Sequence, residues 1–262
     1  MYLRSKTVLL WTLPIVILAC AVSAALIRGS SSQTPVQPRT GELRNLSLQP
    51  EALKLSRRLG NRFASSRQTS STLAGTLITG ALQREINVVR RQTSSGEEVG
   101  IGVAGAAGTL TWSDVEGPGA SGATVNEGQR LLIERLVLDS PDQFVLAQLR
   151  GASYYTVARN VRSDLGGRDD YTGPLWDVIR VEEPERGAAR RPQRNSRLYY
   201  INAQTGLIDK IVSEVRGEKI EASVRQWVEQ GGENIPAHIV WKRGDETVQE
   251  FRLTSFTVQP QP

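Results

Sequence analysis

The sequence of 262 residues has few of the side chains on which metal and redox sites depend. It contains one Cys and one His, which excludes an intramolecular disulfide, a cysteine-based zinc cluster and any site with two imidazoles. At 39% hydrophobic residues the chain is not a multi-span membrane protein, but it is long enough to bury a sizeable core. A binding protein, a structural module and an enzyme that works through carboxylates remain possible.

The net positive charge of the chain is confined to its N-terminal end. The formal net charge of +5 would by itself indicate nucleic acid or another anionic partner. Residues 1–67, however, contain 10 Lys+Arg and 2 Asp+Glu, a net charge of +8, whereas residues 68–262 contain 22 and 25, a net charge of −3. We therefore expect no nucleic-acid partner, and expect the anionic partner to be a membrane surface beside the N-terminal segment.

Residues 1–28 are typical of an export signal or a single transmembrane anchor. Arg4 and Lys6 precede an uncharged run, residues 7–27, which as a helix would be roughly 31 Å long and could span a bilayer. The small residues 22–24 also fit a signal-peptide cleavage site. Lipidation of Cys20 is a third alternative, because residues 17–20 resemble a bacterial lipobox. Each alternative predicts an exported, membrane-associated protein whose bulk is periplasmic or otherwise extracytoplasmic.

The next segment, residues 29–48, has the Ser- and Pro-rich composition of a flexible linker. Pro50 then begins a helical pattern with an apolar and a basic face. The apolar face contains Ala52, Leu55, Leu59 and Phe63, and the basic face contains Lys54, Arg57, Arg58 and Arg62. Such a helix either packs on the domain with its basic face in solvent or lies on an anionic membrane surface.

From residue 72 onward, apolar residues recur at every second position, which predicts β-strands. Two short helices interrupt them, residues 126–138 with Asn126 as N-cap and residues 143–149. The predicted strands are 73–79, 86–90, 97–103, 109–115, 153–162, 175–181, 197–202, 207–215, 220–228, 235–241 and 248–258. The predicted loops are 117–122, 164–173 and 182–195.

The spacing of about ten residues between tight turns indicates an antiparallel meander. Residues 49–258 are therefore predicted to form an α+β domain, mainly antiparallel β, with an N-terminal helix and two short mid-chain helices over a curved sheet. A disordered tail is expected at residues 259–262. Seven aromatic residues fall on predicted strands, where they pack across the sheet or line an apolar cavity. They are Tyr154, Tyr155, Trp176, Tyr199, Tyr200, Trp227 and Trp241.

Local patterns that could carry chemistry fit structural roles better. Residues 100–105 match the dinucleotide fingerprint, but a β-branched and aromatic segment follows where that site needs a helix. His238 lies in a strand and has no second His or Cys to act with.

Two charge clusters are even weaker candidates for a binding site. The acidic cluster, Asp164, Asp169 and Asp170, lacks the spacing of an EF-hand loop. The positive charge of the basic cluster, Arg190, Arg191 and Arg194, is diluted by nearby Glu residues. We therefore predict no catalytic, cofactor-binding or metal-binding residue, and no cofactor.

Four short segments near the C-terminus form a recognisable pattern, together with the order of the elements. They are residues 198–202 (LYYIN), 205–208 (TGLI), 234–239 (NIPAHI) and 251–256 (FRLTSF). The pattern resembles bacterial cell-envelope proteins of the LolA/LolB/LppX-like class. The resemblance implies a half-open β-barrel whose concave face, covered by helices, holds lipid acyl chains, and it implies no catalytic residue. The charged loop 182–195 and a retained anchor depart from that class.

These observations predict a non-enzymatic cell-envelope protein that binds a lipid or lipoprotein acyl chain in a cavity of its curved sheet. One alternative is a membrane-anchored structural or protein-interaction module without cargo. Another is a hydrolase with an inward-facing carboxylate pair, for which the sequence offers no candidate pair.

Overall fold

The computed structural model describes residues 49–60, 69–93, 96–106, 108–114, 116–121, 125–162, 173–184, 195–215 and 217–260. All of these residues belong to the unit Gln37–Pro262. Within these ranges, no helix is long and apolar enough to cross a membrane. The predicted N-terminal segment and linker lie outside them, as do Cys20, Arg62 and Phe63.

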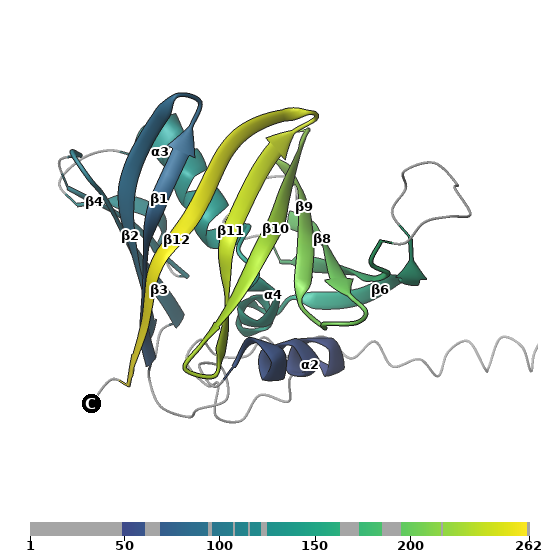
Figure 1. The fold of residues 1–262 in the computed structure, drawn as a ribbon. Helices are drawn as coiled ribbons and strands as arrows, with labels where there is room; N and C mark the ends of the chain where they lie inside the picture. Colours follow the sequence, from purple (N-terminus) through teal and green to yellow (C-terminus); the bar gives the residue numbers. More distant parts are fainter. Residues whose placement is uncertain are drawn as a thin grey trace, which may run out of the picture. The chain divides into compact units, whose positions relative to one another are not determined.

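The described strands form one antiparallel sheet of twelve, in the order β5-β4-β3-β2-β1-β12-β11-β10-β9-β8-β7-β6 (Figure 1). The strands are β1 Thr69–Thr79, β2 Leu82–Thr93, β3 Gly96–Val103, β4 Thr109–Ser113, β5 Gly117–Ala120, β6 Ser153–Val161, β7 Trp176–Glu183, β8 Asn195–Asn202, β9 Ile208–Val215, β10 Glu218–Gln230, β11 Glu233–Arg243 and β12 Glu246–Pro260. Two meanders, β1–β5 and β6–β12, are joined through the pair β1–β12. The sheet is not closed, because β5 and β6 are its two edges.

Short helices cover one face of this sheet, here called the inner face. They are α2 Pro50–Leu59, α3 Glu127–Ile133, the π-helix η3 Glu134–Leu138, α4 Gln143–Leu146 and the 3-10 helix η4 Ala147–Arg150. The helical segment, residues 126–150, connects the edge strand β5 to the edge strand β6 and therefore crosses the inner face (Figure 1). Asn126 caps it as predicted, since its Oδ1 accepts a hydrogen bond from the Gln129 amide at 2.9 Å.

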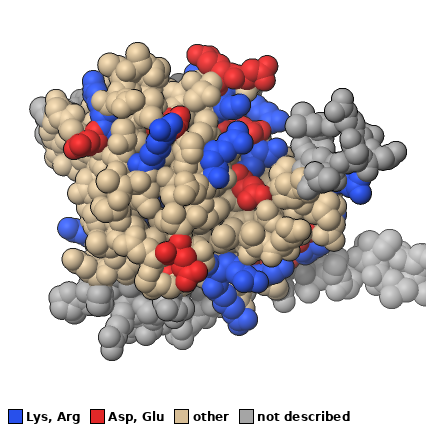
Figure 2. Space-filling view, in the orientation of Figure 1, with Lys and Arg blue, Asp and Glu red and all other residues tan. Residues whose placement is uncertain are grey.

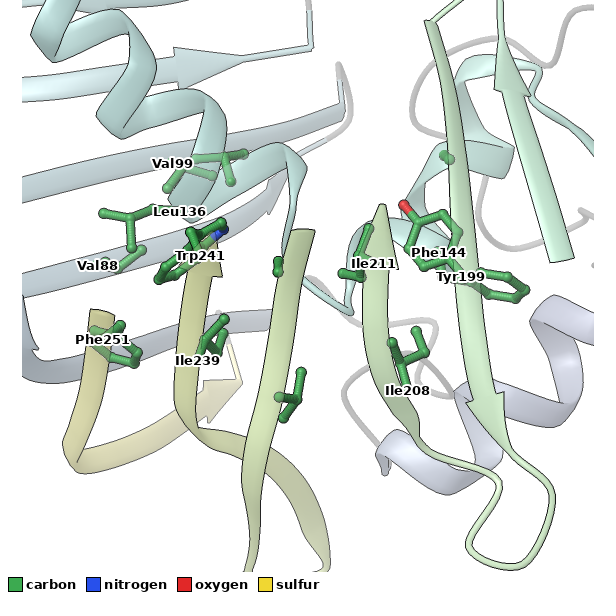
Figure 3. Packing of buried hydrophobic residues seen from close by; sticks show 14 of the residues in the cluster. Val88, Val99, Leu136, Phe144, Tyr199, Ile208, Ile211, Ile239, Trp241 and Phe251 are labelled. Carbon is green, nitrogen blue, oxygen red and sulfur yellow. The ribbon is translucent and has the colours of Figure 1, made fainter. Parts of the chain in front are cut away.

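The alternating residues of the strands place the core between the inner face and the helices. Trp241 and Tyr199 are fully buried from the sheet side, and Phe144 is fully buried from the helical side (Figure 3). The Phe144 ring packs edge-on against Tyr199, with 4.9 Å between the ring centroids. One hydrophobic cluster includes residues of both meanders and of the helices.

Gly75 lies where the two meanders meet. A Cβ at this position would lie 2.8 Å from Cζ of Phe251 and closer still to the carbonyl oxygen of Arg252. The register of β1 against β12 also shifts between Ala74 and Gly75. The close approach of the two backbones therefore depends on glycine.

The predicted fold class, α+β and mainly antiparallel with an unclosed sheet, is confirmed, whereas several strands differ from their predicted bounds. Residues 117–120, predicted as loop, form β5, and residues 182–183 and 195, also predicted as loop, belong to β7 and β8. β12 continues to Pro260, so residues 259 and 260 pair with β1 instead of belonging to a disordered tail. In each case the strands pair through backbone hydrogen bonds at residues that lack the alternation of apolar and polar side chains by which a strand is predicted.

Candidate functional site

The inner face and the helical segment enclose a small apolar cavity of about 40 Å³. Most of its wall is aliphatic or aromatic and comes from β1, β2, η3, β11 and β12; the apolar lining residues are Leu73, Val88, Leu136, Ile235, Pro236, Ile239, Trp241, Phe251 and Phe256. Figure 3 shows Leu136 of the helical segment facing Val88 and Trp241 of the sheet. Both meanders therefore contribute to the wall.

Polar groups lie at one edge of the cavity. Arg90 of β2 donates from Nη2 to the carbonyl oxygen of Leu136 at 2.9 Å and to Oγ of Ser140 at 3.1 Å. Its Nη1 lies 2.7 Å from Oε1 of Glu97. Arg90 and Glu97 are both buried, so the guanidinium holds η3 to the sheet with its charge compensated.

A second arginine extends these contacts to the other meander. Nε of Arg150 lies 2.6 Å from Oε2 of Glu183 on β7, and its Nη1 lies 3.4 Å from Oδ1 of Asp114. Gln143 connects the two arginines, because it accepts from Arg150 Nη2 at 2.5 Å and donates to Glu97 Oε2 at 2.7 Å. Burial would lower the pKa of Arg150, but Glu183 and the other carboxylates outweigh it and raise that pKa above its usual range.

Arg197 of β8 completes this buried network. Its Nε lies 3.2 Å from Oδ1 of Asp139, and its Nη1 lies 3.4 Å from Oε1 of Glu183. Burial raises the pKa of Asp139, and the attraction of Arg197 only partly opposes that shift. The helical segment is thus attached to β2 and β3 at one side and to β7 and β8 at the other.

The alternation of residues along β2 and β8 contains a signal for this network. Arg90 stands in phase with the buried Ile86 and Val88, and Arg197 stands in phase with Tyr199. Because side chains of a strand alternate between faces, a charged residue in phase with buried ones must itself point inward. An inward charge needs a partner, which predicts a buried ionic contact.

Four of the seven aromatic residues predicted on strands form two pairs with different surroundings. Tyr199 and Trp241 lie in the core. Trp176 and Tyr200 pack edge-on against each other, with 6.0 Å between the ring centroids, and Lys210 lies over both rings. Lys210 Nζ lies 4.2 Å from the Tyr200 ring centroid.

The glycine motif and the histidine occupy the structural positions that the sequence indicates. Residues 100–105 form the end of β3 and the turn after it, and the next element is the strand β4. His238 lies on β11, where its Nε2 is 2.9 Å from Oε1 of Glu250. The acidic and basic clusters of the predicted loops lie outside the described residues: Asp164, Asp169, Asp170, Arg190, Arg191 and Arg194. Among the residues that the structure describes, no group of three His, Cys, Asp or Glu side chains is placed to hold a metal ion.

No protein-family model and no curated protein matches the sequence. Solved structures with a similar course of the chain include a DUF1329 family protein from Desulfovibrio piger, with 8% identity, a TM-score of 0.48 and coverage of 79% of this chain and 89% of that one. A LolA superfamily protein from Nitrosomonas europaea has 10% identity, a TM-score of 0.44 and coverage of 83% and 96%. An outer membrane lipoprotein-sorting protein domain from Vibrio parahaemolyticus has 8% identity, a TM-score of 0.47 and coverage of 80% and 91%. The matched structures include a member of the class that the C-terminal motifs resemble, and the likeness concerns the course of the chain alone.

Proposed function

We propose that this protein is a non-enzymatic cell-envelope protein that takes the acyl chain of a lipid or lipoprotein between its helical segment and the inner face of its sheet. The observation that carries the proposal is the apolar cavity beneath η3, with polar groups only at one edge. An acyl chain bearing a polar end matches such a lining, because apolar surface is buried while Arg90, Ser140 and Asp142 stay near the polar end.

The volume of the cavity sets a condition on binding. About 40 Å³ accommodates little more than one water molecule, whereas ligand sites usually measure about 300–1,000 Å³. The helical segment must therefore move away from the inner face when the chain enters. Its polar attachments can be exchanged for contacts with water or with the polar end of the ligand. Its apolar contacts, such as that of Leu136 with the sheet, can be replaced by contacts with the acyl chain.

Photo-crosslinking of the full chain in lipid nanodiscs tests the proposal. A fatty acid that carries a diazirine and an alkyne is added, the sample is irradiated, and modified peptides are mapped by mass spectrometry. We expect adducts on residues 235–241 and 251–256, and an excess of unlabelled phospholipid distinguishes a phospholipid site from a fatty-acid site. Adducts confined to residues 7–27 would contradict the proposal, since they report only contact of the apolar run with the bilayer.

Two neighbouring valines of β2 provide a matched control. Val88 lines the cavity, whereas Val89 lies on the opposite face of the same strand. Val88→Phe fills the cavity and is expected to reduce the inner-face adducts severalfold, whereas Val89→Phe leaves them unchanged. Circular dichroism confirms that both variants are folded.

The second candidate is an envelope interaction module without cargo, and the small volume of the cavity favours it. In that case the helical segment is a permanent part of the core. If the protein is such a module, we expect the full chain to cross-link to defined envelope proteins in native membranes and to form no fatty-acid adducts on the inner face.

A further inference from the structure

We propose that a basic surface on α2, formed by Lys54, Arg57 and Arg58, docks on the anionic headgroups of a membrane. The apolar face of this helix is already occupied: Ala52 and Leu59 are 0% exposed and Leu55 is 1% exposed. The helix therefore packs on the domain and does not insert its apolar face into a bilayer. The opposite, basic face is presented to the surroundings as part of a folded body.

The positive charge of this surface is not compensated within the described part of the chain. Lys54, Arg57 and Arg58 are exposed, and none of them forms an ion pair with a described carboxylate. The acidic residue of the helix, Glu51, is turned to Arg159, with 3.2 Å between Oε1 and Nη2. Figure 2 shows blue side chains gathered where Figure 1 places α2.

The surface has a fixed position on the domain. Asn234 donates from Nδ2 to the carbonyl oxygen of Arg58 at 2.6 Å, and the Gln49 amide donates to Oε1 of Gln148 at 2.9 Å. A Cβ on Gly206 would lie 3.2 Å from Nε of Arg58, so the β8–β9 turn also approaches the helix closely. Docking through α2 would therefore orient the whole domain.

The distribution of charge and of apolar sequence favours a membrane as the partner. Residues 68–262 carry a net charge of −3, so an anionic surface attracts the α2 end and repels much of the remainder. Twenty-two residues, 28–49, separate the apolar run at residues 7–27 from Pro50. A linker of that length reaches at most about 75 Å whatever its conformation, so insertion of the run raises the effective concentration of α2 at the bilayer.

Docking through α2 also determines which wall of the cavity faces the membrane. Ile235 and Pro236, which line it, follow directly after Asn234, which is bonded to α2. Docking therefore brings this wall of the cavity toward the headgroups. The docking surface adds to the proposed function and does not depend on it, because charge attraction needs no cargo.

Fluorescence quenching in nanodiscs tests the docking on the full chain. A Cys20→Ser, Leu53→Cys background allows one fluorophore to be attached beside Lys54, where Leu53 is 37% exposed. Nanodiscs contain a headgroup nitroxide lipid in phosphatidylcholine, either alone or with phosphatidylglycerol. We expect quenching with phosphatidylglycerol that is weak without it and that disappears near 1 M salt, where the screening length falls to about 3 Å.

Charge-neutral variants decide whether the three side chains are responsible. Each basic residue near an anionic surface changes the docked-to-free ratio about fivefold, so Lys54→Gln/Arg57→Gln/Arg58→Gln should lower the ratio about a hundredfold. The matched control, Arg84→Gln/Arg130→Gln/Lys219→Gln, removes the same charge from exposed positions distant from α2. Equal losses in both triple variants, or equal quenching in neutral and anionic nanodiscs, would overturn the docking surface while leaving the cross-linking result untouched.

Discussion

At the scale of single residues, Tyr199 shows how burial sets a chemical property. Its ring is fully buried, and its hydroxyl has no hydrogen-bond partner among the described residues. Burial raises the pKa of this hydroxyl, with Glu183 and Asp139 adding to the shift and Arg197 opposing it. An unfolded tyrosine ionises near pH 10, so the stability that this group contributes is present below pH 10 and is lost as the pH rises toward its higher folded value.

Tyr199→Phe should therefore flatten the alkaline loss of stability. At pH 7 we expect the free energy of unfolding to be unchanged or raised by up to about 1 kcal/mol, because an unpaired buried hydroxyl is removed. Above pH 10 the variant should lose stability more slowly than the natural protein. Urea unfolding at pH 7 and pH 11 measures both effects, with the exposed Tyr155→Phe as control. Identical pH profiles for all three proteins would show that Tyr199 ionises freely in the fold.

Arg90 is the residue on which the attachment of η3 depends most directly. Arg90→Met leaves Glu97 buried with one partner fewer and leaves the Leu136 carbonyl without this donor. Removal of one member of a buried ion pair costs about 3–5 kcal/mol, so a loss of that size is expected in urea unfolding. Arg84→Met, at an exposed position of the same strand, should change stability by about 0.5 kcal/mol or less.

A second substitution separates the unpaired charge from lost packing. Adding Glu97→Gln to Arg90→Met should restore part of the stability, because the buried negative charge is then absent. If the double variant is no more stable than Arg90→Met, the loss comes from packing of the arginine stem.

At the scale of elements, the sequence predicted those strands whose side chains alternate and whose turns contain glycine. β8 to β12 all appear close to their predicted bounds, because one face of each strand is apolar and the other polar. β5 was missed for the opposite reason. Its residues Gly117–Ala120 include two glycines and a proline, and they pair with β4 through the backbone without an apolar pattern.

The junction of β1 and β12 depends on one glycine. Gly75→Ala would press a methyl group against the Phe251 ring and the Arg252 backbone, and overpacking of this kind typically costs about 1–3 kcal/mol. Gly102→Ala is a matched control, since a Cβ there would lie 3.9 Å from its nearest neighbour, the carbonyl oxygen of Asn87. Urea unfolding should show the loss for position 75 alone; equal stability of the two variants would mean that the junction yields at little cost.

At the scale of the whole molecule, two properties could not be obtained from the sequence. The pairing of β1 with β12 joins segments about 180 residues apart, and no local signal records it. The volume left under the helical segment depends on how side chains from both meanders interlock, which alternation does not determine. In contrast, the alternation of side chains along β2 and β8 is sufficient to predict that Arg90 and Arg197 point inward.

The shared core and the buried network predict that both meanders open together. One cluster contains Val99 and Trp112 from the first meander and Ile211 and Trp241 from the second. Arg150 also bonds to Asp114 before β5 and to Glu183 on β7. Loss of either meander would therefore expose the inner face of the other and leave charges of the network unpaired.

Native-state hydrogen exchange measures this coupling. The most protected amides of β3 and of β9 should exchange with the same free energy of opening, and Gly75→Ala should lower both values equally because it weakens the strand pair that joins the meanders. A lower opening free energy for β2–β4 than for β8–β11 would mean that the first meander opens alone. In that case an acyl chain would reach the cavity by separation of the sheet at β1 and β12, and displacement of the helical segment would not be required.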